Sequence, residues 1–526
     1  MDISHMSEEE QLQAAMQLSL EASMAAPVPE ERSSQLLLPS RPDKRQFPGK
    51  DPQDVLPDLT RGDSAKKKRG EPTEATTMDE KQVEEVLQLL FGDNPEATDV
   101  ERWLRVGFTW SPRSGTEWGL WQKQGGPCGV YAPVQAFIVK HLLFGSGEEP
   151  TARRKEHPLG TGADDEDDRG AVLAHALASI LFQSTSGSSY TICQVHFASE
   201  GDDAESQAVQ QAAPTAVAAG QGCSVLSVQA RQKVPRIAEA RQILEEGADS
   251  WLAGPLGVLS FLFSVLVSRT LVAVKEDMDD PSTPLIGRFG HCSQELVNLM
   301  LIGESISNVF DGTRWLGDDP SSGFLVRGVD SERVGVPPVG LLSELETYRY
   351  LSVGMLYKNP DFPIWVLASP THYTMIFSTK RADSQLSEEA KLDQQVKKVF
   401  VENSIDEGGL AMSMNLSKML EALGIDSKRL QEAQQDIVRE DVILWQDFRQ
   451  WVGRQFNVAA AGKTSGKIQL FLYDGQDPPG PNLKSITVEL SDIDPAYACG
   501  GAEGDAFVAT LQTRWPEGVV LVENLG

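Results

Sequence analysis

Cysteine and histidine are scarce in this chain. Its 526 residues include only 5 cysteines and 7 histidines, and the cysteines are odd in number and widely spaced. This usage does not indicate a disulfide framework, and we expect reduced thiols in a cytoplasmic or nuclear protein. The few histidines also leave a short list of candidates for any catalytic base.

Positive charge and long apolar runs are also in short supply. The chain has 47 Lys and Arg against 76 Asp and Glu, a net charge of −29, which argues against nucleic acid as the main partner. No secretory signal sequence is visible. The most apolar stretch, 252–267, is short and carries Gly254 and Pro255 early, so we interpret it as a buried core helix and expect no membrane partner.

A hydrophobic content of 40% over this length predicts a sizeable core and more than one ordinary domain. Residues 24–77 are rich in Pro, Ser and charge and predict a disordered linker. The basic run Lys66-Lys67-Lys68-Arg69 within this linker is either a nuclear-import signal or a solvated patch. Ordered structure should begin near Thr77, where Thr77 and Glu80 have capping-box spacing ahead of a helix that Gly92 would end.

Two stretches predict mobile insertions on the surface of the ordered region. Residues 146–170 contain the acidic run Asp164–Asp168, and residues 199–222 are rich in Ala and Gln. Low-complexity segments of this kind usually form loops.

The segment Trp121–Gly129 has the layout of a thiol nucleophile. Cys128 follows a Gly-Gly-Pro turn, precedes an apolar run, and comes six residues after Gln122. A cysteine at the start of a helix meets free backbone N–H groups that favour the thiolate. The Gln122 amide and the Cys128 N–H could bind an oxyanion, a spacing similar to that of papain-like enzymes. On these residues alone, a buried structural cysteine remains an equal alternative.

Among the histidines, His372 is the best candidate for the base. It opens an apolar strand that follows residues 362–368 across a Ser-Pro-Thr turn, which predicts an antiparallel hairpin. His291 adjoins Cys292 and hints at a functional turn or a metal pair, but one Cys-His couple is weak evidence for zinc. We therefore expect no metal and no cofactor. Ser369 and Thr374 are polar candidates to orient His372, and the sequence does not choose between them.

Four motifs together resemble the catalytic region of the MINDY family of deubiquitinases. They occur in the family's order, and the resemblance as a whole runs from about Met78 to the end of the chain. The motifs are Gln122–Phe137 around the cysteine, Leu285–Leu299, Ser307–Gly312, and Phe362–Val366 with Thr371–Thr374 around the histidine. The resemblance implies an α+β fold, a variant of the papain-like cysteine proteases, over residues 78–526. It assigns Cys128 as nucleophile, His372 as general base and acid, and Gln122 as part of the oxyanion hole.

An amphipathic segment near the N-terminus, residues 7–23, resembles a ubiquitin-interacting motif. An acidic cluster precedes residues with helical spacing, namely Leu12, Ala15, Met16 and Ser19. Glu21 lies one position earlier than the motif's usual closing acidic residue, and any short amphipathic helix is the alternative reading. Such a helix would gain order by placing its apolar face on a partner.

Residues 401–456 predict a pair of helices where relatives carry an EF-hand-like insertion. If Gly409 takes the sharp-turn position, Ser404 and Gly408 stand where acidic ligands are needed, so calcium binding is not expected. The apolar runs 468–473 and 485–490 predict strands that complete the catalytic domain.

The resemblance implies a monomeric thiol hydrolase that cleaves isopeptide bonds in polyubiquitin, with a preference for K48-linked chains taken from the family alone. Two alternatives stay open: an unproductive adaptor that only binds ubiquitin, and a thiol amidase that acts on a ubiquitin-like modifier. The presence of Gln122, Cys128 and His372 together argues against the adaptor.

Overall fold

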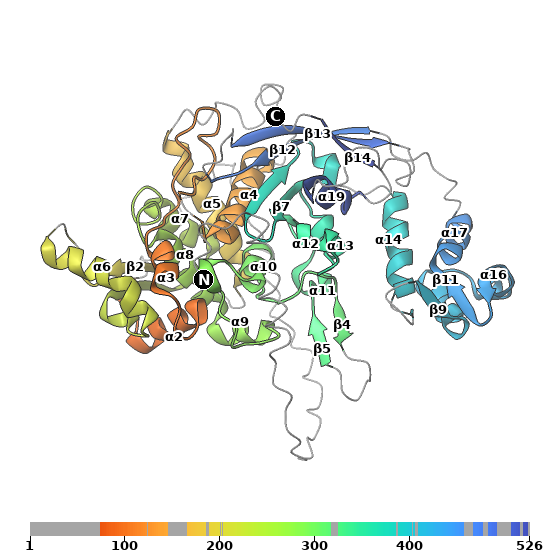
Figure 1. The fold of residues 1–526 in the computed structure, drawn as a ribbon, viewed down its shortest axis with the longest axis horizontal. Helices are drawn as coiled ribbons and strands as arrows, with labels where there is room; N and C mark the ends of the chain where they lie inside the picture. The colour runs from red at the N-terminus through yellow and green to blue at the C-terminus, as the bar shows by residue number, and fades with distance from the viewer. Residues whose placement is uncertain are drawn as a thin grey trace, which may run out of the picture. The chain divides into compact units, whose positions relative to one another are not determined.

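The structure is a computed structural model that describes residues 74–123, 125–145, 166–185, 189–199, 201, 203–316, 324–384, 388–401, 403–404, 409–456, 466–476, 482–491, 506–515 and 519–523. The described residues form two compact units, one drawn from Met1–Lys380 and Leu470–Ser485, the other from Arg381–Gln469 and Ile486–Leu525. Helices and strands both contribute to them (Figure 1), which confirms the expected α+β class.

The first unit contains most of the secondary structure. Its elements in chain order are β1 (Thr76–Thr77), α2 (Glu80–Phe91), α3 (Ala97–Leu104), α4 (Cys128–Phe144), α5 (Glu166–Ser184), β2 (Tyr190–Phe197), α6 (Ala204–Ala218), β3 (Leu226–Val234), α7 (Ile237–Gly247), α8 (Gly257–Arg269), α9 (Leu271–Asp277), α10 (Gln294–Ile302), β4 (Thr313–Leu316), β5 (Phe324–Arg327), α11 (Ser331–Val334), β6 (Gly340–Ser343), α12 (Glu344–Thr347), α13 (Met355–Lys358), β7 (Ile364–Ala368), β8 (Tyr373–Phe377) and the end of β12 (Gly466–Tyr473).

A sheet with the strand order β12, β8, β7 and β6 carries the predicted histidine hairpin. Strands β7 and β8 are antiparallel, and Ala368 faces Tyr373 in their register, so residues 369–372 form the connecting turn. The hairpin is confirmed, although β8 begins at Tyr373, one residue after His372. Every residue of β7 is buried, and helix α4 packs against both strands.

Helix α4 is apolar around most of its circumference, which is typical of a helix buried on all sides. It packs against α5 and α10 in addition to the hairpin. Pro133 lies inside the helix and has no N–H to donate, so one helical hydrogen bond is lost there. The helix nevertheless begins at Cys128, five residues before this proline.

A second sheet has the order β1, β3 and β2, and α8 packs against β2. Because β2 is an edge strand, its outward N–H groups need partners. Serines of α8 accept those hydrogen bonds at 2.9, 2.8 and 2.9 Å, in the pairs Ser260 with Val195, Ser264 with Cys193, and Ser268 with Thr191. From Gly257 on, the apolar stretch 252–267 forms a buried core helix as predicted, whereas residues 252–256 precede the helix as turns and bends.

Within the described residues, no single helix is long and apolar enough to cross a membrane. Helices α8 and α9 reach that length and composition only as a pair, and the chain bends by 84° between them.

The first helix differs from its prediction at the cap. Asp79, and not Thr77, is the N-cap of α2, and its side chain accepts a hydrogen bond from the Lys81 N–H. Thr77 instead lies in β1, paired with Gln229 of β3. Gly92 follows the last helical residue with φ of 72°, as expected for a helix that ends in glycine.

The two stretches that we expected to be loops both contain helix. Residues 204–218 of the Ala/Gln-rich stretch form α6, which begins at the N-cap Asp203 and packs against α3. Helix α5 begins at Glu166, before the end of the acidic stretch 146–170. Alanine and glutamine are good helix formers, so their repetition favoured a helix as well as a loop.

The second unit has α14 (Glu388–Val401), β9 (Leu410–Met412), α15 (Leu416–Ala422), α16 (Leu430–Ile437), β10 (Val438–Arg439), β11 (Val442–Leu444), α17 (Trp445–Gln455), β13 (Leu483–Ser491), which begins in the first unit, α19 (Ala506–Gln512) and β14 (Val519–Glu523). Two helix–strand–helix segments, α14 to α15 and α16 to α17, are joined by antiparallel pairing of β9 with β11. The range 401–456 is thus helical as predicted, but it holds α15, α16 and α17 where we expected a pair.

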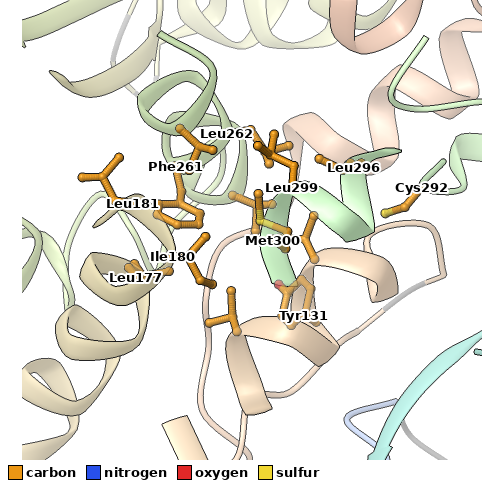
Figure 2. Close-up of a cluster of buried hydrophobic side chains, with 14 of the residues drawn as sticks. Tyr131, Leu177, Ile180, Leu181, Phe261, Leu262, Cys292, Leu296, Leu299 and Met300 are labelled. Carbon is orange, nitrogen blue, oxygen red and sulfur yellow. The ribbon is translucent and has the colours of Figure 1, made fainter. Parts of the chain in front are cut away.

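Each unit has a hydrophobic core of its own. Figure 2 shows part of the first, where side chains from α5, α8 and α10 converge on one another. Tyr131 of α4 belongs to this cluster, and Cys292 lies at its edge, close to the start of α10. The start of the cysteine helix is therefore anchored in the core of the first unit.

Candidate active site

Cys128 is the first residue of α4, where the helix offers unsatisfied N–H groups. The carbonyl of Pro127 accepts from Val130 N at 2.9 Å and Tyr131 N at 3.0 Å, which closes the first turn. The Cys128 side chain is 2% exposed, and its thiol donates to the Gly126 carbonyl at 3.8 Å. In general, the first turn of a helix is a place where the dipole and the free N–H groups favour negative charge.

The turn before the cysteine needs glycine at position 126. Gly126 has φ of 118°, a conformation that other residues rarely adopt. A Cβ atom there would also lie 3.2 Å from the Gly290 carbonyl oxygen. The Gly-Gly-Pro signal in the sequence therefore reflects a backbone requirement as well as a turn.

His372 ends the turn of the β7–β8 hairpin, and Ser369 fixes its backbone. Ser369 N donates to the His372 carbonyl at 2.9 Å, and the Ser369 hydroxyl both accepts from His372 N at 3.1 Å and donates to the His372 carbonyl at 3.0 Å. Ser369 was one of two candidates to orient the imidazole, yet these bonds hold only the main chain. Thr374, the other candidate, lies in β8 opposite Leu367.

The imidazole is held by Asp474, which the sequence analysis missed. Asp474 follows the last residue of β12, and its Oδ1 accepts a hydrogen bond from His372 Nε2 at 3.0 Å and from Gln476 N at 2.9 Å. This geometry places a proton on Nε2. The other ring nitrogen, Nδ1, is buried without a hydrogen bond of normal geometry, so it is the nitrogen left to meet the Cys128 sulfur.

The environment of His372 stabilises its protonated form. Burial alone would lower the pKa of the ring, but hydrogen bonds to Asp474 and Cys128 and the negative charges of both raise the pKa of His372 from 6.5 to about 9. A raised pKa keeps the imidazolium charged near neutral pH, as a thiolate–imidazolium pair requires.

Gln122 is buried, at 3% exposed, and its segment is clamped between α4 and β12. Gln122 N donates to the Gly475 carbonyl at 2.7 Å, and the Tyr473 hydroxyl donates to the Leu120 carbonyl at 2.8 Å. From the α4 side, Gln135 Oε1 accepts from Leu120 N at 2.5 Å. The end of β12 thus positions both the Gln122 loop and, through Asp474, the histidine.

A small pocket connects these elements. Its lining comes from the Gln122 loop, α4, β8 and the end of β12, namely Leu120, Gln122, Tyr131, Ala132, Gln135, Tyr373, Thr374, Met375, Tyr473 and Gly475. The structure therefore brings Gln122 to the elements that carry Cys128 and His372.

His291 and Cys292 do not form a metal site with other ligands in the described part of the chain, where no group of three or more His, Cys, Asp or Glu is suitably placed. Burial and the neighbouring Arg102 charge lower the pKa of His291. The proposed ubiquitin-binding residues Leu12, Ala15, Met16 and Ser19, the linker 24–77 up to residue 73, and the basic run 66–69 lie outside the described residues.

Comparison with known proteins gives a consistent family. The model of the conserved domain of the deubiquitinating enzymes MINDY-3/4 matches residues 87–406. The chain is 30% identical over 435 residues to ubiquitin carboxyl-terminal hydrolase MINDY-3 of Xenopus tropicalis, covering 79% of this chain and 91% of that protein. It is 29% and 28% identical over 456 residues to MINDY-3 of Bos taurus and Homo sapiens, covering 82% of this chain and 96% of each relative.

No solved structure matches the chain. The matched residues 87–406 include the cysteine helix and the histidine hairpin, and the relatives extend the likeness beyond them. The chain therefore belongs to the MINDY-3/4 family of deubiquitinating enzymes.

Proposed function

We propose that this protein hydrolyses the isopeptide bonds of polyubiquitin with Cys128 as nucleophile and His372 as general base and acid. The observation that carries the proposal is the hydrogen bond of Asp474 with His372, together with Cys128 at the start of a helix and near enough to help raise the pKa of His372. This combination resembles the papain-like arrangement of a helix-borne cysteine and a strand-borne histidine. The related MINDY-3 proteins are named ubiquitin carboxyl-terminal hydrolases.

We propose the following roles for these residues. The Cys128 thiolate attacks the carbonyl carbon of the terminal glycine of ubiquitin, and the resulting oxyanion is bound by the Gln122 side chain and the Cys128 N–H. His372 then donates a proton to the lysine amine as the C–N bond breaks, which leaves a thioester. Water, activated by the neutral imidazole, hydrolyses the thioester and restores the thiol.

Asp474 acts as the positioning residue. It accepts from Nε2 and so directs Nδ1 toward the sulfur, and its charge stabilises the imidazolium that forms during the reaction. Asp474 is itself oriented through its neighbours, because its main-chain N–H donates to the Asn482 carbonyl at 2.9 Å.

The buried position of the sulfur sets a condition on the substrate. Cys128 is 2% exposed and hydrogen-bonded to the Gly126 carbonyl, so a substrate carbonyl reaches it only after the Gly126 turn shifts. A chain end of two glycines suits such a narrow opening, which supports ubiquitin as the substrate. Preference for K48 linkages is a proposal from the family resemblance alone.

The N-terminal segment 7–23 would add a second ubiquitin contact through Leu12, Ala15, Met16 and Ser19. Tethered by the linker, it would raise the local concentration of polyubiquitin without contributing to catalysis. We further propose that the protein acts as a monomer in the cytoplasm or nucleus, without a metal or other cofactor.

The helix–strand–helix pair of the second unit supports an EF-hand-like insertion. Strand pairing between the two connecting segments, β9 with β11, is the arrangement by which two such hands associate. Where acidic ligands would be needed, position 404 holds a serine, whose hydroxyl donates to the Val401 carbonyl at 2.8 Å. We propose that this insertion does not bind calcium.

The test combines a ubiquitin that carries a C-terminal electrophile with a panel of defined chains. We expect a covalent adduct that Cys128→Ala abolishes and the control Cys223→Ser retains, together with cleavage of K48-linked chains. Cys223 is a suitable control because it lies in the loop before β3 and contacts Glu84.

The alternatives predict different results. An adaptor would bind chains in pulldowns yet give neither adduct nor cleavage, even after residues 1–77 are removed. A thiol amidase would react only with a modifier other than ubiquitin. Either result would overturn the proposed hydrolysis of polyubiquitin.

A further inference from the structure

A second cysteine lies against the proposed nucleophile, although the reaction above does not use it. Cys292 precedes α10 in the chain and is 164 positions from Cys128, yet both thiols donate to the same acceptor, the Gly126 carbonyl, at 3.7 and 3.8 Å. A Cβ atom added to Gly129 would lie 2.6 Å from Cys292 Cβ and 2.8 Å from its Sγ. The two sulfurs therefore occupy one small volume at the start of α4.

The surroundings of Cys292 keep its thiol protonated at rest. Burial raises the pKa of Cys292 well above its ordinary value, and the negative charge of Cys128 raises it further, while the N–H groups of Gly129 and Val130 act in the opposite direction. Figure 2 shows its side chain at the edge of the apolar cluster. Burial, the larger of the two causes, therefore keeps the Cys292 thiol protonated, and a negative charge on Cys128 adds to its effect.

We propose that Cys292 is a resolving cysteine, which forms a reversible disulfide with Cys128 after a peroxide has oxidised the nucleophile. This inference rests on the proposed role of Cys128 as the reactive thiol. It assigns a modification site to a pair of residues at the active site, with hydrogen peroxide as the oxidant.

The chemistry balances in two steps. The Cys128 thiolate attacks a peroxide oxygen, the O–O bond breaks, and the products are a sulfenic acid and, after one proton is taken up, water. The Cys292 sulfur then attacks the sulfenic sulfur, the S–O bond breaks, and the hydroxyl leaves with the Cys292 proton as a second water. The two sulfurs together lose two electrons to one molecule of peroxide.

The first step also prepares the second. A sulfenic acid is neutral, so oxidation removes the Cys128 charge that opposes ionisation of Cys292. The N–H groups of Gly129 and Val130 that favour the Cys292 thiolate remain in place. Gly129 has no side chain to separate the two cysteines, and the glycine at position 126 allows the turn to adjust as the S–S bond forms.

The disulfide would have two consequences. It removes the nucleophile, so hydrolysis stops while oxidant is present. It also prevents further oxidation of Cys128 to sulfinic or sulfonic acid, which thiols cannot reverse. The enzyme would therefore recover once a reductant returns.

The experiment uses the full chain, reduced, exposed to about a tenfold molar excess of hydrogen peroxide, which is enough to take an unprotected cysteine to sulfinic or sulfonic acid, and then divided. One half is alkylated and digested for mass spectrometry, and the other is treated with dithiothreitol and assayed. We expect a peptide pair linked through Cys128 and Cys292, lighter by about 2 Da than the two thiol peptides together. Activity should fall at least about tenfold and return almost fully after reduction.

Two variants provide the comparison, each measured relative to its own reduced rate. Cys292→Ala should lose activity with the same peroxide and stay inactive after dithiothreitol, with Cys128 recovered as sulfinic or sulfonic acid. Cys223→Ser, which leaves both active-site cysteines unchanged, should behave as the unmodified chain does.

The proposal would be overturned if the Cys292→Ala variant recovered its full activity after reduction. It would also be overturned if Cys128 of the unmodified chain were linked to a cysteine other than Cys292, or were oxidised to sulfinic acid. The mapped linkage does not depend on turnover. A reduced chain that fails to react with electrophilic ubiquitin would therefore count against the proposed function, while a Cys128–Cys292 linkage in that same chain would still support the disulfide.

Discussion

Asp474 decides which nitrogen of His372 carries a proton, since its Oδ1 accepts from Nε2 at 3.0 Å. Asp474→Asn should slow cleavage of a ubiquitin chain by about 10²-fold, because a neutral amide no longer stabilises the imidazolium. The pKa of His372, raised from 6.5 to about 9, should fall. Since the leaving amine needs the protonated ring, the alkaline limb of the pH–rate profile should move to lower pH.

The matched control is Asp249→Asn, an exposed carboxylate outside the site. It should leave both the rate and the profile unchanged. A profile of Asp474→Asn that coincides with that of the unmodified chain would mean that Asp474 has only a structural role.

The same residue shows what the sequence could and could not reveal at this scale. Cys128, Gln122 and His372 each lie in a local pattern, a turn before an apolar helix or the start of a buried strand. Asp474 is 102 positions from His372, and an Asp-Gly pair after a strand is an ordinary turn signal. Only the pairing of β12 with β8 brings it to the imidazole.

Gly129 is a second residue whose role depends on a distant partner. Gly129→Ala should destabilise the protein by about 1–3 kcal/mol, because the new methyl group would lie 2.6 Å from Cys292 Cβ in a packed core. Chemical denaturation of the purified variant measures the loss. Adding Cys292→Gly, which removes both crowded atoms, should restore part of it, and no restoration would contradict the close approach of the two residues.

At the scale of elements, α8 stabilises the edge of β2 through serines spaced four residues apart. Four residues advance a helix by about 6 Å and two residues advance a strand by about 6.6 Å, so successive serines meet alternate strand N–H groups. Ser264 accepts from Cys193 N at 2.8 Å and also donates to the Ser260 carbonyl at 2.8 Å. The helix thus satisfies backbone groups that no further strand covers.

Ser264→Ala should lower the free energy of unfolding by about 1–3 kcal/mol, because the buried Cys193 N–H would lose its acceptor. Hydrogen exchange should quicken at Cys193 in particular. The control is Ser224→Ala, because the Ser224 hydroxyl is exposed and donates to the Gln221 carbonyl. This substitution should lower the free energy of unfolding by less than about 0.5 kcal/mol. Equal effects of the two substitutions would exclude a special role for the α8 serines.

Elements were predicted well where their apolar pattern was strong. The hairpin of β7 and β8 and the core helix α8 have continuous apolar runs, and both were confirmed. Helix α6 was missed because its Ala-rich sequence lacks an apolar face of large side chains. Its buried residues are few, namely Ser206, Ala213, Pro214 and Val217. Packing against α3 therefore stabilises α6, whereas the apolar pattern of its sequence does not predict it.

At the scale of the whole molecule, the described residues form two separate hydrophobic cores. All residues of the candidate site, Cys128, Gln122, His372 and Asp474, lie in the first unit, whereas Phe448 is fully buried in the core of the second. The sequence indicated more than one domain by its length, and it predicted a strand at 468–473 that completes the catalytic domain, where β12 pairs with β8. It did not indicate that the residue after this strand would contact His372. The return of the chain to the first unit at Leu470 supplies Asp474, so the site requires a segment beyond the second unit's helices.

Phe448→Ala should therefore destabilise the second unit, since truncating a buried phenylalanine costs about 3–5 kcal/mol. The rate at which Cys128 reacts with electrophilic ubiquitin should stay within about twofold of that of the unmodified chain, because the site lies in the first unit. Hydrogen exchange should rise in α14 and α17 but not in α4. The matched variant Phe261→Ala, in the core of the first unit, should instead raise exchange in α4 and slow the reaction, because Phe261 contacts Phe108 and Phe108 contacts Tyr131. Loss of the reaction in Phe448→Ala, with faster exchange in α4, would show that the two cores unfold as one.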